Sequence, residues 1–384
     1  MLKTGVGYSK LTSAMEAGTE AATKAMATVK TPKVAMLFTS EKYQQEEVVI
    51  GVKDVVGDIP IIGCTSSDGI IVPEGIITAD MPFVGIMIIQ EPNMIVSTAG
   101  SSMKKNARET GQIVAVEAIK ESKLKKVPSY FYVTSTPGDE EEYIKGIQDV
   151  IGNVPCFGGS ASANKKHKVF SGVNVYKNGV AVAFFYTNKK IVNKFDGNYT
   201  ETNDVGIITK VDKKRVLKTI DGKPAIEKYM EWTGKELDSL KGNNIFSQTV
   251  LSPIGIKDPL GDLILVRQSL FGNGDSSINM SNNLAVNTAA IRLETTVDGL
   301  IESTEKLLSE VRKNIKVPSG YFMIHSVGRK IGIDDRLEEV YKRILKEANG
   351  KPFIVGFTSC EYGSKNHSGN ACGSLMLSFT GFSE

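Results

Sequence analysis

Apolar residues recur along the chain in three blocks that share one order of elements. Each block holds two strand-length apolar runs with a helical segment between them, and the paired runs are 32–40 and 59–67, 128–136 and 154–162, and 318–326 and 351–359. The runs are apolar on both faces, as in central strands covered on two sides, whereas the intervening segments are amphipathic. This repetition predicts three right-handed βαβ units.

The spacing within the blocks supports a common unit. A serine at the end of each first strand precedes a glycine of the second strand by 23, 23 and 30 residues, for the pairs Ser40 and Gly63, Ser135 and Gly158, and Ser326 and Gly356. The extra length of the third block follows "GRKIGID". We expect it to form a surface loop that leaves the strands in place.

Other periodic segments complete the predicted fold. A further apolar strand follows each block, at 83–90, 180–187 and 374–381. The sequence "KNGV" before the second of them favours a tight hairpin, because Asn-Gly supplies the positive φ values of such a turn. Helices are expected at about 11–29, 104–122 and 298–315, and the polar, β-prone stretch 190–245 is typical of a connector.

These elements predict an α/β protein. We expect two lobes of mixed sheets, built from repeated βαβ-β units with flanking helices. The expected division runs between a domain at 1–218 and a domain at 219–384.

Charge and hydropathy narrow the class of protein. The 46 basic and 43 acidic residues are scattered, with no basic block dense enough to neutralise a row of phosphates, so no nucleic-acid partner is expected. The longest apolar runs are too short for a membrane span, and the N-terminus lacks the apolar core of a signal peptide. We therefore expect a cytoplasmic protein without a membrane partner.

No cofactor and no metal are expected from the motifs. The glycine pairs in "GVGYSK" and "FGNGDSS" complete neither a dinucleotide-binding nor a phosphate-loop motif. The cysteines form no close Cys/His pairs and no disulfide framework, so reduced thiols are expected at Cys64, Cys156, Cys360 and Cys372.

Small polar residues gather where the predicted strands end. Ligands of open α/β sheets bind at the carboxyl ends of parallel strands, where glycine permits close approach and hydroxyls hydrogen-bond carboxylates or amides. The same residues also suit ordinary turns and helix caps. We expect a cleft for a small polar ligand lined by Ser40, Gly63, Thr65, Ser66, Ser135, Gly158, Gly159, Ser160, Ser326, Gly356, Thr358 and Ser359.

Charged residues near these loops are candidates for binding a zwitterion. Glu361 and Asp68 suit its ammonium group, and Arg329 suits its carboxylate through a bidentate fork. Arg267 interrupts the apolar run "LILVRQSL" and needs an acceptor if buried, either a ligand carboxylate or a structural ion pair. Asn370 stands near the end of the last loop.

Several motifs, in their order along the chain, resemble the FIST family. They include "IIGCTSSDGI", "CFGGSASAN", "VLKTIDGKPAIEKYMEW", "LILVRQSLFGNGDSSINM" and "VGFTSCEYGSKNHSGNACGSLML", of which "DGKPAIEKY" is the most specific part. Together they are similar to a FIST N-terminal domain followed by a FIST C-terminal domain. The resemblance implies an intracellular sensory module that binds small ligands such as amino acids, and we expect a separate signalling partner protein.

Two other classes remain open beside a sensor. A thiol nucleophile is conceivable, because Cys64, Cys156 and Cys360 lie in or beside the loops and His325 or His367 offers a base. An interaction scaffold is also conceivable, because the helix at 298–315 has an amphipathic face. We favour a sensor over an enzyme, with closure or reorientation of the lobes on binding.

Overall fold

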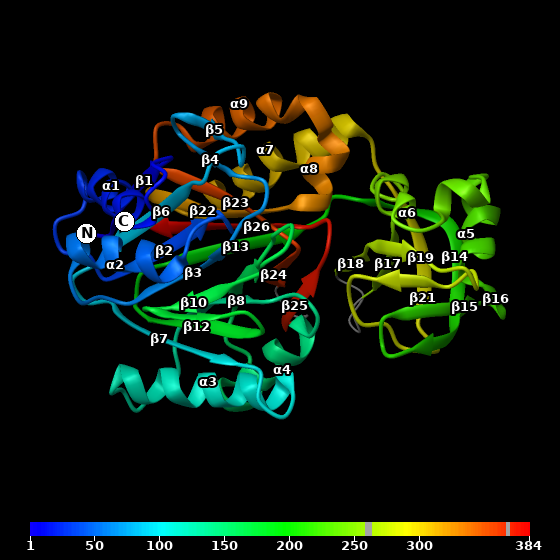
Figure 1. Ribbon diagram of the computed structural model, residues 1–384, viewed down its shortest axis with the longest axis horizontal. Helices are drawn as coiled ribbons and strands as arrows, with labels where there is room; N and C mark the ends of the chain where they lie inside the picture. The colour runs from blue at the N-terminus through cyan, green and yellow to red at the C-terminus, as the bar shows by residue number, and fades with distance from the viewer. Residues whose placement is uncertain (258–262, 366–368) are drawn as a thin grey trace.

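The computed structural model describes residues 1–257, 263–365 and 369–384, and it divides into two lobes (Figure 1). The larger lobe contains three six-stranded mixed sheets and most of the helices. The smaller lobe, at the right of Figure 1, is built on a fourth sheet and is joined to the larger lobe through residues 197–199 and 295–296. The predicted two-lobed α/β fold is confirmed.

The three sheets of the larger lobe share one plan. The first has the order β1 (Lys3–Ser9), β6 (Val84–Gln90), β2 (Val34–Thr39), β3 (Ile61–Thr65), β10 (Val169–Ser171) and β11 (Asn174–Tyr176). The second has the order β25 (Gly369–Gly373), β24 (Cys360–Lys365), β9 (Cys156–Ser160), β8 (Tyr130–Ser135), β12 (Gly179–Tyr186) and β7 (Ile95–Ser102). The third has the order β13 (Ile191–Asp196), β26 (Leu377–Ser383), β22 (Pro318–Ser326), β23 (Phe353–Thr358), β4 (Ile70–Val72) and β5 (Gly75–Ile77).

The three predicted βαβ units form these sheets. The parallel pairs are β2 with β3, β8 with β9, and β22 with β23. The helices of the larger lobe are α1 (Ala14–Met26), α2 (Gln45–Val56), α3 (Ala107–Ser122), α4 (Glu140–Ile151), α7 (Val297–Lys313), α8 (Val327–Ile333) and α9 (Leu337–Ala348). Much of the extra length of the third block therefore forms α8 and the 3-10 turn at Asp334–Arg336, and the expected simple loop is wrong.

A hairpin that follows each unit in the sequence belongs to the sheet of another unit. Strand β4 pairs with β23 of the third unit, β10 pairs with β3 of the first unit, and β24 pairs with β9 of the second unit. Each sheet is thus completed by a neighbour, and the three units interlock in a ring. Aromatic residues from all three units fill the centre, where the ring of Phe322 lies 5.0 Å from Phe38, 5.5 Å from Tyr132 and 6.2 Å from Phe157.

The smaller lobe has its own apolar core. Its sheet has the order β18 (Ile264–Arg267), β17 (Ile254–Lys257), β21 (Ala289–Glu294), β14 (Thr200–Asp212), β15 (Val216–Ile220), β20 (Ile278–Met280) and β19 (Ser269–Gly272), with β16 (Lys223–Pro224) beside β15. Helices α5 (Ala225–Thr233) and α6 (Asn244–Gln248) cover it. The stretch expected to be a connector therefore forms β13 to α6, and the domain boundary predicted after residue 218 falls inside β15.

Two details of strand pairing differ from the sequence predictions. The hairpin expected at Asn178 and Gly179 is wrong, because β12 pairs with β7 and β8 while β11 pairs with β10. Gly179 instead permits close approach of β7, since a Cβ there would lie 2.1 Å from the Ser101 carbonyl oxygen. In the first unit, Thr39 pairs with Thr65 at the end of the parallel strands. Ser135 and Ser326 occupy the same place in the other two units, so Thr39 is their counterpart. Ser40 therefore lies one residue beyond the first strand.

The interlocked hairpins make a prediction about stability. Ile70 in β4 is fully buried and pairs with Gly356 of the third unit, and a Cβ on Gly85 of the first sheet would lie 2.2 Å from its Cδ1 atom. Replacement Ile70→Ala should lower the free energy of unfolding by about 3 kcal/mol, because it leaves a cavity where two units meet. Urea unfolding measures this loss. The matched control Ile50→Ala, at a side chain that is 42% exposed on α2, should lose less than about 1 kcal/mol; equal losses would contradict the interlocked arrangement.

Candidate functional site

A cavity of about 420 Å³ lies between the two lobes, and we call it the interlobe pocket. The larger lobe contributes the loop after β8, the N-terminal end of α4, and the ends of β22 and β23. The smaller lobe contributes the β14–β15 turn, α6 and the ends of β18 and β20. Its lining residues are Pro137, Gly138, Glu140, His167, Arg215, Phe246, Gln268, Leu270, Met280, Ser281, Ser326, Val327, Gly328, Ser359 and Ser374.

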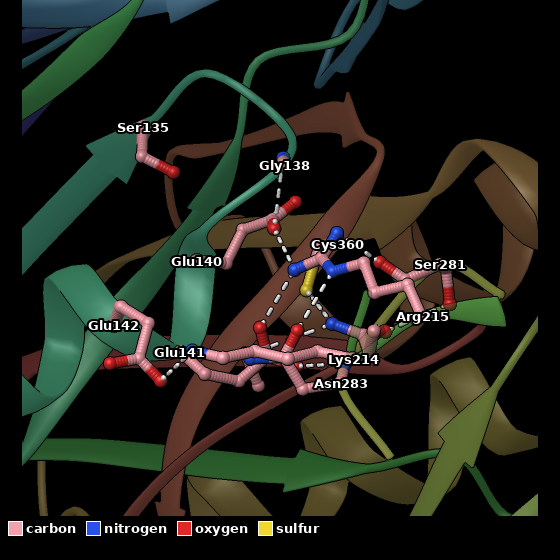
Figure 2. Close-up of polar contacts among 12 residues, drawn as sticks. Ser135, Gly138, Glu140, Glu141, Glu142, Lys214, Arg215, Ser281, Asn283 and Cys360 are labelled. Carbon is pink, nitrogen blue, oxygen red and sulfur yellow. Dashed lines mark hydrogen bonds and ion pairs between the residues drawn. The ribbon is translucent and has the colours of Figure 1, made fainter. Parts of the chain in front are cut away.

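One guanidinium group joins the lobes beside this pocket (Figure 2). The Arg215 Nη2 atom lies 2.7 Å from Glu140 Oε2 and 2.8 Å from Glu141 Oε2, so one cation is shared by two carboxylates. Arg215 also donates from Nε to Asn283 Oδ1 and from Nη1 to the Ser281 carbonyl oxygen. We call this arrangement the Arg215 bridge.

The local sequence explains both ends of the bridge. In "GDEEEY" the helix α4 begins at Glu140, whose position is one helical turn before the buried residues Tyr143 and Ile144, so Glu140 faces inward. Its Oε2 atom accepts the Gly138 N–H at 3.0 Å. On the other lobe, Arg215 follows the tight turn formed by Lys213 and Lys214, which both have positive φ, and this turn directs the side chain toward α4.

The two carboxylates differ in their electrostatic environment. Burial raises the pKa of Glu140, and the charge of Glu141 raises it further, although Arg215 opposes the shift. Burial also opposes ionisation of Glu141, but Arg267 and Arg215 outweigh it and hold the pKa of Glu141 below its ordinary value. Glu140 is therefore the carboxylate of the pair that takes up a proton first as the pH falls.

Close packing across the lobe interface depends on Gly328 at the start of α8. A Cβ at this position would lie 2.4 Å from Gln268 Oε1 of the smaller lobe and 2.5 Å from Leu375 Cδ2. The pocket wall beside it is apolar, with Phe246, Leu270 and Met280. The pocket thus joins an ion pair, several hydroxyl groups and an apolar surface.

The structure brings some of the predicted loop residues together in the interior of the larger lobe. The second-strand ends of the three units meet, since Ser162 N–H donates to the Thr65 carbonyl oxygen and Ser359 N–H donates to the Ser160 carbonyl oxygen. Ser66 accepts the Phe357 N–H. Of the predicted residues, only Ser326 and Ser359 line the interlobe pocket, while the others in this meeting point are buried: Gly63, Thr65, Ser66, Gly158, Gly159, Ser160, Gly356 and Thr358.

The remaining predicted residues lie elsewhere. Ser40 accepts the Lys42 N–H in the turn before α2, and Ser135 hydrogen-bonds the Tyr362 hydroxyl at 2.6 Å. Asp68 pairs with Lys330 at 2.8 Å. Arg267 and Asn370 line a separate groove on the other side of the Arg215 bridge.

Arg329 and Glu361 are both fully buried, and the structure gives each of them internal partners. Arg329 donates to the carbonyl oxygens of Gly197, Leu375 and Leu300 and to Ser303 Oγ. Glu361 accepts from Thr358 Oγ1 and from the Met376 N–H, both at 2.9 Å, and burial raises its pKa well above the ordinary value. The Arg329 contact with Gly197 fixes the backbone where the chain leaves for the smaller lobe.

The geometry does not favour the thiol-nucleophile alternative. All four cysteines are buried, and burial raises the pKa of each thiol, that of Cys64 to about 11. Thiolate is the reactive form, so such thiols are poor nucleophiles. His325 is buried with a pKa lowered to about 3 by burial and by Arg329, and His367 lies outside the described residues.

Metal binding finds no support in the part of the chain that the structure describes. No group of three or more His, Cys, Asp or Glu side chains there is arranged to hold a metal ion. In the same residues, no helix has the length and apolar character needed to span a bilayer.

Sequence reasoning missed the residues that make the bridge and most of the pocket polar groups: Glu140, Glu141, Arg215, Gln268, Ser281 and Ser374. The usable signal was the first turn of α4, where an acidic residue falls on the apolar face of an amphipathic helix. A buried carboxylate there requires a cation from elsewhere in the chain.

The fold and the site define a two-lobed α/β protein with a polar pocket between its lobes. A FIST N domain matches residues 33–223 and a FIST C domain matches residues 225–364. The chain therefore belongs to the FIST family, whose domains are associated with sensing and signal transduction.

Three solved structures show distant similarity to this chain. A cyanuric acid hydrolase is 8% identical, with 100% of both chains covered and a TM-score of 0.34. PurL of Thermotoga maritima complexed with ATP is 11% identical, with 99% of this chain and 72% of that chain covered and a TM-score of 0.22. PurLQS from the same organism is 10% identical with the same coverage and a TM-score of 0.24. Comparison with curated proteins finds no match.

The Arg215 bridge makes a second prediction about stability. Arg215→Ala should lower the free energy of unfolding by about 3 kcal/mol, because it leaves two neighbouring carboxylates, only 2% and 13% exposed, without their shared cation. Urea unfolding measures the loss, and limited proteolysis should show earlier cleavage at 197–199 and 295–296. The control Lys218→Ala removes a more exposed pair with Asp275 and should cost less than about 1 kcal/mol. A variant Arg215→Ala as stable as the control would show that the bridge does not hold the lobes.

Proposed function

We propose that this FIST protein is an intracellular sensor that binds a small polar ligand, an amino acid or a related carboxylate, in the interlobe pocket. The pocket itself carries this proposal, because it lies between lobes joined by only two chain segments and holds charged, hydroxyl and apolar groups together. Its volume of about 420 Å³ falls in the range of small-molecule sites.

The chemistry of the lining residues suits a zwitterion. Glu140 uses its Oε2 atom for Gly138 and Arg215, and Figure 2 shows its other oxygen directed away from Arg215. That oxygen is the group for a ligand ammonium. The Ser326 hydroxyl accepts the Leu375 N–H, so its own proton is suited to a ligand carboxylate. A ligand side chain fits the apolar wall formed by Phe246, Leu270 and Met280.

The pocket location couples binding to lobe position. A ligand that contacts both lobes stabilises the arrangement in which the pocket is closed, in proportion to its difference in affinity for the two arrangements. Closure by rotation about the segments 197–199 and 295–296 would present a changed surface to a separate signalling partner.

Ligand-dependent stabilisation tests the proposal. A panel of amino acids and small carboxylates should contain a compound that raises the free energy of unfolding by about 2.7 kcal/mol at 100 times its dissociation constant. Glu140→Gln should weaken that binding at least about tenfold, and Leu270→Trp should do the same by filling the pocket. The matched controls are Glu142→Gln and Phe271→Trp, whose side chains do not line the pocket and should leave binding unchanged. If neither Glu140→Gln nor Leu270→Trp weakens ligand binding, the ligand site lies outside the interlobe pocket.

The raised pKa of Glu140 gives a pH dependence. A ligand ammonium binds the ionised carboxylate, so affinity should fall as the pH is lowered toward the pKa of Glu140, which burial places above its ordinary value of 4.5. Calorimetric titrations between about pH 5 and pH 8 should show weaker binding at the acidic end, because amino acids do not change charge in this range. In the variant Glu140→Gln, ligand affinity should not change with pH over this range. An affinity that rises on acidification would contradict the assignment of Glu140.

A further inference from the structure

A second and larger cavity, of about 680 Å³, lies on the other side of the Arg215 bridge. Glu141 and Asn283 of the bridge face this cavity, whereas Glu140 and Arg215 face the interlobe pocket. Helix α4 forms one wall, and strands β17, β18 and β25 with the loop after β20 form the others. We call it the lysine groove. It is lined by Glu141, Glu142, Ile144, Lys145, Gln148, Lys214, Ile256, Lys257, Leu265, Arg267, Asn283, Leu284, Ala285, Thr288, Asn370, Ala371 and Cys372.

The lysine groove combines an apolar floor with a basic rim. Ile144, Ile256, Leu265 and Leu284 supply aliphatic surface from both lobes. Among the described lining residues, four carry positive charge, namely Lys145, Lys214, Lys257 and Arg267, and two carry negative charge, namely Glu141 and Glu142. The described part of the groove therefore has an excess of positive charge beside an apolar surface.

The lysines on the rim are only loosely neutralised. Lys145 and Lys214 share the single carboxylate of Glu142, each at 3.4 Å, and Figure 2 shows Lys214 and Glu142 on the same side of the bridge as Glu141. Lys257 pairs at 3.0 Å with Glu201, which is not part of the groove lining. Exposed pairs of this kind exchange readily with another anion.

The hydrogen bonding of Arg267 is a second and independent indication that the lysine groove binds a ligand. The residue is only 4% exposed and lines the groove, and its charge acts on Glu141. Its hydrogen-bond acceptors among the described residues are nevertheless backbone carbonyl oxygens. Its Nε atom donates to Asn283 and its Nη1 atom donates to Val266 and Cys372. Among the described residues its Nη2 atom has no hydrogen-bond acceptor, so a buried guanidinium keeps donor capacity for a group that enters the groove.

We propose that the lysine groove is a second binding site, for a free carboxylate that carries an aliphatic chain. The carboxylate accepts from Arg267 Nη2 at the buried end, where a charge-assisted hydrogen bond is strong. The chain lies along Ile144, Ile256, Leu265 and Leu284, and the rim lysines add attraction for the negative charge. A small hydrophilic anion would leave this apolar floor exposed, and a neutral alcohol would offer Arg267 Nη2 only an uncharged acceptor, which forms a weaker hydrogen bond.

Calorimetric titration with octanoate tests this proposal on the full-length protein. Octanoate should bind with a stoichiometry of one, and acetate and octan-1-ol should each bind at least about tenfold more weakly, because one lacks the chain and the other lacks the charge. Binding of octan-1-ol as tight as that of octanoate would overturn the role of Arg267. Binding of several octanoate molecules without saturation would show association with the surface and would also overturn the proposal.

Variants on the rim and at the mouth of the lysine groove test whether octanoate binds there. Ala285→Trp should weaken octanoate binding at least about tenfold by filling the groove from an exposed position, and Lys257→Glu should weaken it by reversing a rim charge. Lys120→Glu, on the exposed face of α3, is the matched control for charge and should leave binding unchanged. Leu270→Trp, in the interlobe pocket and outside the Arg215 bridge, should change octanoate affinity less than about twofold, which separates this proposal from the proposed sensor site. Octanoate binding that Ala285→Trp and Lys257→Glu leave unchanged would exclude the groove.

Discussion

One guanidinium group, held between two carboxylates, links the smaller lobe to the larger one at the wall between the two cavities. Arg215 is the cation for Glu140 and Glu141, and these two glutamates face different cavities because they are consecutive residues at the start of α4. Buried carboxylates without a cation are costly, so the bridge favours contact between the lobes. Both cavities exist only while that contact lasts.

The two lobes differ in how they are stabilised. In the larger lobe, hairpins exchanged between three units and an aromatic centre make each sheet dependent on its neighbours. The smaller lobe has an apolar core of its own, and it meets the larger lobe through polar groups and through a shared apolar cluster. In that cluster Val250 and Val266 of the smaller lobe lie with Leu300 and Met376 of the larger lobe. Arg329 fixes Gly197 at the exit point, so the chain segment that leads to the smaller lobe is anchored, while apolar packing, hydrogen bonds and the Arg215 bridge hold the lobe itself. This arrangement suits a protein whose lobes move when a ligand binds.

Local patterns in the sequence predicted the units but not their assembly. Apolar runs and amphipathic segments identify the βαβ units, since burial on both faces dictates their composition. Hairpin exchange depends on contacts between distant segments, and "KNGV" favours a hairpin that the pairing of β12 with β7 overrides. Equal spacing along the sequence makes Ser40 the equivalent of Ser135 in the repeated unit. The strand register instead makes Thr39 the residue equivalent to Ser135. The site was largely missed because Arg215 lies in a polar turn that resembles a connector, and only the fold brings it to α4.

The distance between the lobes is the most direct test of the role assigned to Arg215. Spin labels at Lys120→Cys on α3 and Lys223→Cys beside β15 would report it by pulsed electron paramagnetic resonance, because both positions are exposed and the four native cysteines are buried. The bridge predicts one narrow distance distribution in the protein with Arg215 intact. It also predicts a broader and longer distribution after Arg215→Ala. An unchanged narrow distribution in that variant would contradict the claim that this shared cation holds the lobes together.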